Sequence, residues 1–328
     1  NFFQLGGDSI ISLQLIARAR QAGLHFTPRQ LFQHQTISTL AQEVSAHQGA
    51  TAEQTPVVGP VPLIPIQASF LEEGSPEPHH FNQALMLKLR EPVEPSVLET
   101  ALRKLVEHHD ALRLRFVRED GRWTQHNTGV EHAPTLRRED VSALAPAERS
   151  ARVEAVATEV QSSFRLDAPP LLRAALFDFG PGEPARLLLV AHHLVVDAVS
   201  WRVLAEDLET LCRQLQRGET AALPPKTTSF KAWAERLHQH ARSEALASEL
   251  PYWLDEARAH ARSLPRDLSS GPNTVTSSRT VSASLDAEAT GLLLREVPAG
   301  YRARIQDVLL AALGRALASW SGHSRFLV

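Results

Sequence analysis

The spacing of apolar side chains divides the chain into a short helical region and a long mixed region. Within residues 1–47, apolar positions recur three and four residues apart, for example at Ile37, Leu40 and Val44, which predicts short helices. Residues 48–61 have no such period and contain several prolines and glycines, so we expect a linker there.

From residue 62 onward, helical and strand-like patterns follow one another, which predicts a mixed α/β fold. Asp120-Gly121 is typical of a tight hairpin turn. Strands are expected at 81–89, 112–117, 123–126, 172–179, 186–191 and 279–285. Helices are expected at 96–108, at 146–164, from about 200 to 216, at 229–262, and in two segments after 285, the second at 305–320.

Composition narrows the class of protein. The chain has 328 residues, 43% of them hydrophobic and 22% charged, with a net charge of −3. These values are typical of a globular protein of two or three domains, and they favour neither nucleic acid nor a membrane as a partner. The single cysteine, Cys212, excludes an internal disulfide and a multi-cysteine metal site. We therefore expect a cytoplasmic protein with no bound metal.

Residues 192–201, read HHLVVDAVSW, carry the strongest candidate chemistry. Two adjacent histidines close an apolar strand, so only one of them can face a given cavity. A histidine in such a place suits proton transfer near neutral pH, because its ordinary pKa is about 6.5. In a chain with 15 histidines, spacing alone leaves open a pair of ordinary strand-end residues.

The string Phe3-x-Leu5-Gly6-Gly7-Asp8-Ser9-Ile10 is the second signal. It resembles the core of the peptidyl carrier domains of non-ribosomal peptide synthetases, and the resemblance extends over residues 1–47. It implies that Ser9 carries 4′-phosphopantetheine, attached by a phosphopantetheinyl transferase. A helix start at this loop could hold the phosphate through backbone amides. The alternative is that Asp8 or Ser9 is only a helix cap.

With a carrier before it, HHLVVDAVSW resembles the HHxxxDG signature of the condensation-domain superfamily, which has the fold of chloramphenicol acetyltransferase. The resemblance implies a small all-α carrier bundle followed by an α/β two-lobed domain at 62–328. Its N-terminal lobe would span about 62–225, and the start of an incomplete second lobe 226–328. Further matching segments are 65–70, 108–113, 229–237 and Tyr252-Trp253. The chain departs from the family at Ala198 in place of glycine, His108 in place of arginine, and Ala68-Ser69.

Four features resemble the epimerization branch of this superfamily. They are the GGDS form of the carrier loop, Phe81-Asn82-Gln83, the variant VVDAVSW, and the segment 301–310. The resemblance implies conversion of an L-aminoacyl or peptidyl thioester to the D-form. The main alternative is a condensation domain that forms a peptide bond, and a non-catalytic docking module is a third reading. A metal hydrolase is disfavoured because adjacent strand histidines diverge.

The resemblance also assigns roles to residues. His193 would be the base or acid, in a tunnel between the lobes, and His192 would face away and pack. We interpret Asp197 as structural, paired with an arginine, and Arg113 is the expected partner. The alternative is that Asp197 has a catalytic role.

Both ends of the chain look truncated. The family's second catalytic group, a glutamate in an EGHGR segment, is expected beyond Val328, so we expect the isolated chain to be inactive and the parent protein to be active. The implied partners are an upstream adenylation domain and a downstream condensation domain of the same synthetase.

Overall fold

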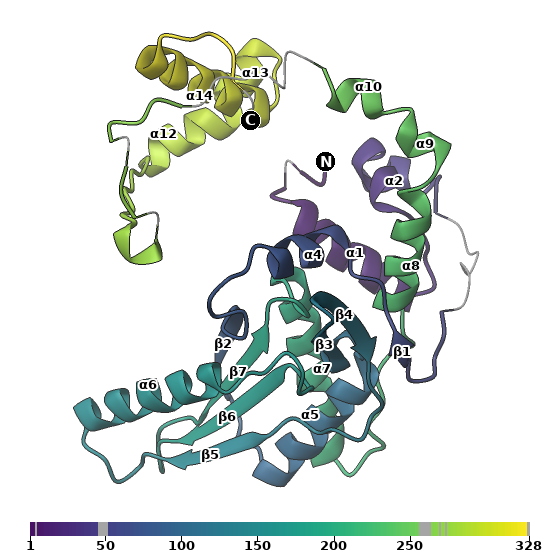
Figure 1. Cartoon of the computed structure of the whole chain (residues 1–328), viewed down its shortest axis with the longest axis vertical. Coiled ribbons are helices and arrows are strands. Elements are labelled where there is room, and N and C mark those ends of the chain that lie inside the picture. The colour runs from purple at the N-terminus through teal and green to yellow at the C-terminus, as the bar shows by residue number, and fades with distance from the viewer. Residues whose placement is uncertain (4, 45–51, 256–263, 269, 273, 327–328) are drawn as a thin grey trace. The chain divides into compact units, whose positions relative to one another are not determined.

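The computed structural model describes residues 1–3, 5–44, 52–255, 264–268, 270–272 and 274–326 (Figure 1). The chain forms two compact units, Asn1–Ala241 and Arg242–Val328. No helix in the described ranges is long and apolar enough to cross a membrane.

Three short helices open the first unit, as the sequence predicts. They are α1 (Ser9–Gln21), α2 (Pro28–Gln33) and α3 (Ile37–Leu40). Thr27 forms a reciprocal capping box with Gln30 and places Pro28 in the first turn of α2, where a missing amide does no harm. Their small core consists of Ile16, Ala19, Phe26, Leu31 and Leu40.

Two sheets form the centre of the first unit. The larger has the order β2-β7-β6-β5, in which only the pair β5 and β6 is parallel. The smaller has the order β1-β4-β3 and is antiparallel. The strands are β1 (Gly59–Pro60), β2 (Asn82–Lys88), β3 (Leu114–Glu119), β4 (Arg122–Asn127), β5 (Leu136–Asp140), β6 (Leu172–Asp178) and β7 (Arg186–His192).

The inner strands β6 and β7 of the larger sheet send apolar side chains to both faces and are buried on each side. Helices α5 (Pro95–His108) and α7 (Ala198–Gln216) pack with Leu187 and Leu189 of β7 on one face. Helix α6 (Pro146–Ser162) packs with Leu188 and Val190 on the other face (Figure 1). A strand covered on both faces reads as a continuous apolar run, which is why 186–191 has no polar alternation.

The remaining elements are short, apart from α8 (Phe230–His240) and α14 (Ile305–Ser321). In the first unit they are α4 (Pro65–Glu72), the 3-10 turn η1 (Asp110–Arg113) and α8. In the second they are α9 (Glu244–Ala247), α10 (Leu250–Trp253), η2 (Val275–Ser277), α12 (Ala287–Gly291), the π-turn η3 (Leu292–Glu296), α13 (Val297–Tyr301) and α14.

The structure differs from the expected elements in four places. Residues 279–285 form no strand and are exposed. The helix expected at 229–262 is interrupted after α8, and 256–263 lie outside the described residues. Strand β5 is not predicted, because its sequence LRRED has no apolar alternation. The end of the expected linker belongs to the folded domain, since Val57 and Val61 are each 4% exposed. Residues 45–51, at the start of that linker, lie outside the described residues.

A buried carboxylate joins three distant segments beside α5. Asp110 accepts hydrogen bonds from the guanidinium of Arg113 at 2.5 Å and from the ammonium of Lys226 at 3.0 Å. The backbone amide of Val57 donates to the same carboxylate at 3.1 Å. Arg113 is fully buried, and its other N–H groups donate to carbonyls at the end of α5. Each charge in this cluster therefore has a hydrogen-bonded partner, as burial requires.

Replacing Asp110 by alanine should destabilise the first unit by about 3–5 kcal/mol, because the Arg113 charge would stay buried without its carboxylate. Urea unfolding at neutral pH measures this loss. Exchange of Glu154, an exposed carboxylate within α6, for alanine provides the control and should change stability by under about 0.5 kcal/mol. Equal stability of both variants would contradict the interpretation of the cluster.

Candidate functional site

The pleat of β7 separates the two histidines at its end. Leu188, Val190 and His192 point to the face covered by α6, and the next residue, His193, leaves the strand toward the side of α7. His192 is fully buried, whereas His193 is partly exposed. The sequence predicts that His192 faces away from the site, and in the structure its ring is buried.

Both ring nitrogens of His192 have backbone partners. Its Nε2 lies 2.9 Å from the carbonyl oxygen of Pro78 and therefore donates to it. Its Nδ1 accepts from the amide of Leu194 at 3.2 Å. Burial lowers the pKa of His192 to about 4, so the ring is neutral at pH 7. Both nitrogens of this imidazole are occupied by backbone groups, and the ring supports the turn after β7.

A chain of hydrogen bonds determines the tautomer of His193. The indole N–H of Trp201 donates to Oε1 of Gln83 at 2.9 Å, and an indole nitrogen can only donate. The amide nitrogen of Gln83 therefore faces His193 and donates to Nε2 of the ring at 3.0 Å. The proton of the neutral ring lies on Nδ1, which donates to the carbonyl oxygen of Val196 at 2.8 Å. His193 thus presents a lone pair on Nε2, as a general base must.

Stacking fixes the orientation of the His193 ring, and a cavity lies near it. The ring of Phe81 stacks on it, with centroids 5.0 Å apart and planes 21° apart. Gln83 and Trp201 line a cavity of about 520 Å³ between β2 and α7. The remaining residues lining this cavity are Ala84, Leu85, Ala198, Arg202 and Ala205.

The carrier loop has the local structure that its sequence predicts. A side chain at Gly7 would meet the Phe2 ring at 2.5 Å, so only glycine fits there. Gly6 has φ of +92°, a region that suits glycine. Asp8 accepts a hydrogen bond from the amide of Ile11 at 2.7 Å and so caps α1. Ser9 is the first residue of the helix, and the capping role belongs to its neighbour.

Comparisons with known proteins agree with this arrangement. The family model described as "Condensation domain" matches residues 57–328. This chain belongs to the condensation domain family. The model described as "Phosphopantetheine attachment site" matches residues 1–44, so the domain is preceded by a carrier segment.

Two curated relatives match the condensation domain together with its carrier. The chain is 46% identical over 332 residues to a component of the linear gramicidin synthase of Brevibacillus parabrevis, covering 100% of the chain and 6% of the relative. It is 43% identical to chondramide synthase of Chondromyces crocatus, covering 99% of the chain and 8% of the relative. The chain therefore spans less than a tenth of the length of either relative.

Solved structures show the same fold. The epimerization domain from the third module of tyrocidine synthetase B matches with a TM-score of 0.72 and 36% identity, over 84% of this chain and 61% of that one. A mutant starter condensation domain of rhizomide synthetase matches with a TM-score of 0.58 and 22% identity, over 81% and 59%. The expected α/β fold of the chloramphenicol acetyltransferase type, with a helical carrier piece before it, is confirmed.

The expected pairing of Asp197 with Arg113 is wrong. Asp197 is the N-cap of α7, where it accepts from the amide and hydroxyl of Ser200 at 2.7 Å each. Arg113 bonds to Asp110, three residues away, which its buried guanidinium reaches within the turn η1. A carboxylate at the start of a helix is satisfied locally by free amides and needs no distant cation.

The surroundings of Asp197 also explain why its carboxyl group has a lowered pKa. Partial burial raises the pKa of the Asp197 carboxyl, but the two hydrogen bonds from Ser200 outweigh this effect, and the pKa falls below its usual value. Ser200 forms a reciprocal capping box with Asp197. Trp201 is buried and also orients Gln83, a role that the sequence does not reveal.

The sequence does not reveal that Gln83 contacts His193. Phe81-Asn82-Gln83 is noted there only as a segment that resembles epimerization domains. In the structure, residues 81 and 83 point to the same side, so both lie beside His193. Residues 110 positions apart in the sequence come together because β2 and β7 are paired neighbours.

Changing Asp197 to alanine should lower the free energy of unfolding by about 1 kcal/mol, the usual value of a lost helix cap. Asparagine at this position keeps a capping oxygen and should lose less than half of that. Urea unfolding of the three proteins makes the comparison. A loss of several kcal/mol in the alanine variant would instead indicate a buried ion pair.

Stability should fall as the pH decreases from about 6.5 to about 4, because the unfolded His192 takes up a proton in this window and the folded one does not. The full effect is about 3 kcal/mol, and below pH 4 it no longer grows. The variant His192→Gln, which cannot be protonated, should lose less stability over the same window. Parallel profiles for both proteins would show that His192 does not titrate in this way.

Proposed function

We propose that this chain acts in non-ribosomal peptide synthesis and that its condensation-family domain inverts the α-carbon of a carrier-bound amino acid. The likeness to an epimerization domain at 36% identity supports the reaction type. The curated relatives are named as synthases of linear gramicidin and chondramide, which supports the setting. The observation that carries the proposal is the lone pair on Nε2 of His193, held by Gln83 and Val196.

In the proposed reaction His193 removes the proton on Cα of the thioester-bound residue. The Nε2 lone pair of His193 takes the proton, and the electron pair of the broken C–H bond moves into the thioester carbonyl. The ring is then doubly protonated, and Val196 continues to accept from Nδ1. A proton returned to the opposite face of Cα completes the inversion. Gln83 must give up its hydrogen bond to Nε2 when the substrate arrives, so it acts as a positioning residue.

The carrier segment fits a 4′-phosphopantetheine group on Ser9. When bound, this group supplies a thiol that holds the amino acid as a thioester, which acidifies the Cα proton. Ser9 begins a helix of 13 residues, whose free N-terminal amides favour a phosphate. Asp8 already caps the helix, so the cap does not depend on Ser9. A tether also keeps the cargo at an effective concentration of about millimolar near the domain.

The domain limits remain predictions and belong to this proposal. We place the carrier at 1–47, the linker at 48–61 with its last residues packed on the domain, and the epimerization domain at 62–328. The proposed partners are an adenylation domain before the carrier, a condensation domain of the next module, and a phosphopantetheinyl transferase.

The alternative is peptide-bond formation, which the family description favours. There, the same Nε2 lone pair of His193 would take a proton from an attacking amine. The two reactions differ in their products, since only epimerization exchanges the α-hydrogen of the cargo with solvent.

The test loads Ser9 of the whole synthetase with L-phenylalanyl-, L-leucyl- or L-alanyl-pantetheine in D₂O. After quenching and hydrolysis, chiral chromatography gives the D/L ratio and mass spectrometry the α-deuterium content. We expect D-amino acid carrying deuterium for the accepted cargo. The variant His193→Gln should lower the rate by about 10²–10⁴-fold, the usual contribution of a general base.

Two further variants sharpen the result. His132→Gln changes an exposed imidazole far along the chain and should leave the rate unchanged. Gln83→Leu removes the hydrogen bond to Nε2 of His193 and should shift the pH–rate profile, a change that loss of folding would not produce. A new peptide bond without deuterium at Cα would establish the condensation alternative. An unaltered D/L ratio in His193→Gln would refute His193 as the base.

A further inference from the structure

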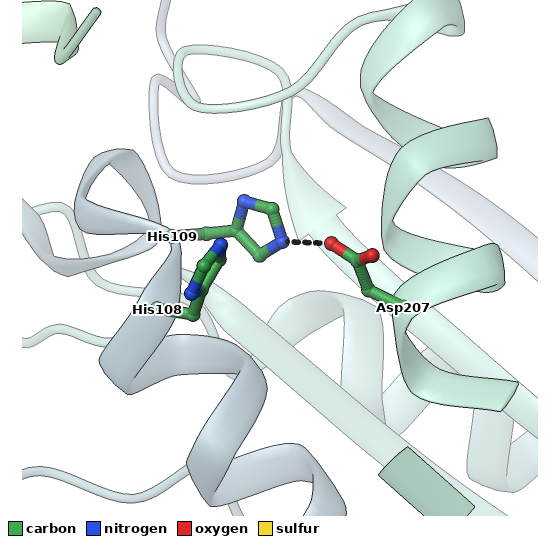
Figure 2. A group of neighbouring side chains, drawn as sticks. All are labelled: His108, His109 and Asp207. Atoms are coloured by element: carbon green, nitrogen blue, oxygen red, sulfur yellow. Dashed lines mark hydrogen bonds and ion pairs between the residues drawn. The ribbon is translucent and has the colours of Figure 1, made fainter. Parts of the chain in front are cut away.

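A cluster of three potential metal ligands lies away from His193, where α5 and α7 meet. His108 ends α5, His109 follows it, and Asp207 lies in the middle of α7. One ligand atom from each residue lies within 4.8 Å of the other two. Figure 2 shows both imidazoles on the side of α5 that faces the Asp207 carboxylate.

The pair His109 and Asp207 is already preorganised. Nε2 of His109 lies 2.8 Å from Oδ2 of Asp207, and both side chains are largely buried, at 23% and 18% exposure. A carboxylate only accepts, so the proton lies on Nε2, and a metal ion would take its place. The core packing of α5 against α7 holds the two residues at this distance.

His108 provides the third ligand. Its ring meets that of His109 edge to face, with centroids 4.9 Å apart, and within the described part of the chain it forms no hydrogen bond. The arginine that usually stands here in the family's motif could not serve as a ligand.

Space and charge around the cluster allow an ion with one open position. His108 lines a cavity of about 200 Å³ together with Glu107, Lys104 and Lys226. The Lys226 ammonium lies 3.0 Å from each oxygen of the Asp110 carboxylate, which also accepts from Arg113, so these three groups together keep one positive charge. Lys104 lies 3.0 Å from Glu107, which compensates its charge. The Asp207 carboxylate belongs to the cluster itself and supplies a negative charge next to an ion.

We propose that His108, His109 and Asp207 bind one Zn²⁺ ion, with a water molecule from the adjoining cavity as the fourth ligand. Two imidazoles and a carboxylate oxygen are ligands that zinc prefers. In a tetrahedral site with metal–ligand distances of about 2.1 Å, ligand atoms lie about 3.4 Å apart. Small rotations of the two rings are needed to reach this spacing. The ion would link the end of α5 to α7 and so brace the helix that follows His193.

The test uses the full chain, freed of metal with a chelator and titrated with ZnCl₂ by calorimetry. We expect one equivalent to bind with a Kd of micromolar or lower, and the thermal unfolding midpoint to rise with zinc. His108→Asn and Asp207→Asn should each weaken binding at least tenfold. His132→Asn is the matched control, an imidazole beside the carboxylate of Glu131 with no third ligand among the described residues, and should bind zinc as the wild type does.

Cobalt gives a readout that does not depend on the variants folding. Co²⁺ bound to the wild-type chain should show the strong visible bands of tetrahedral coordination, which added zinc removes. An octahedral cobalt spectrum, no saturable zinc binding, or equal affinity in wild type and His108→Asn would overturn the proposal. These outcomes are independent of whether the domain epimerizes its cargo.

Discussion

A single pleat at the end of β7 gives two adjacent imidazoles opposite environments, and the candidate chemistry depends on it. His192 continues the inward row of Leu188 and Val190, so it is desolvated and stays neutral. His193 follows the last residue of β7, and its amide donates to the carbonyl of Phe81. Its ring bonds to Gln83 of β2, which Trp201 of α7 orients. The buried ring stabilises the turn that positions the accessible one, since both bond to backbone groups within that turn.

Charged groups play two different structural parts in this domain. Asp110 is buried and bonds to both Arg113 and Lys226, so it connects the first segment of the domain with the end of α5 and the loop after α7. Asp197 lies near the surface and stabilises only the first turn of α7. The difference follows from solvation: a buried cation requires a carboxylate, whereas a helix start offers amides that any short polar side chain can satisfy.

The carrier segment and the domain depend on different kinds of local constraint. In the carrier loop, Gly7 is required because the Phe2 ring occupies the space of a side chain, and Asp8 begins the helix. In the domain, His193 is held by Phe81 and Gln83 from one segment and by Val196 from another. The structure of the carrier loop can therefore be predicted from its own residues. The surroundings of His193 form only when the sheet has folded.

The sequence by itself determined the elements with clear periodicity and the opposite orientation of the two adjacent histidines. The helices α5 to α7, the hairpin at Asp120-Gly121 and the strands β2, β6 and β7 all follow from spacing, because a helix or strand must bury one face whatever its neighbours are. Tertiary structure decided what depends on neighbours. Strand β5 exists because β6 offers it an edge, and 279–285 remain irregular because no strand in the described residues pairs with them.

The same distinction explains the partners of the charged and polar side chains. Arg113 took the nearby Asp110 rather than Asp197, Gln83 met His193 across 110 residues, and His109 met Asp207 across 98. Sequence spacing reports which face of an element a side chain occupies. Which group it meets there depends on how the helices and strands pack, and that is set by the shape of the whole core.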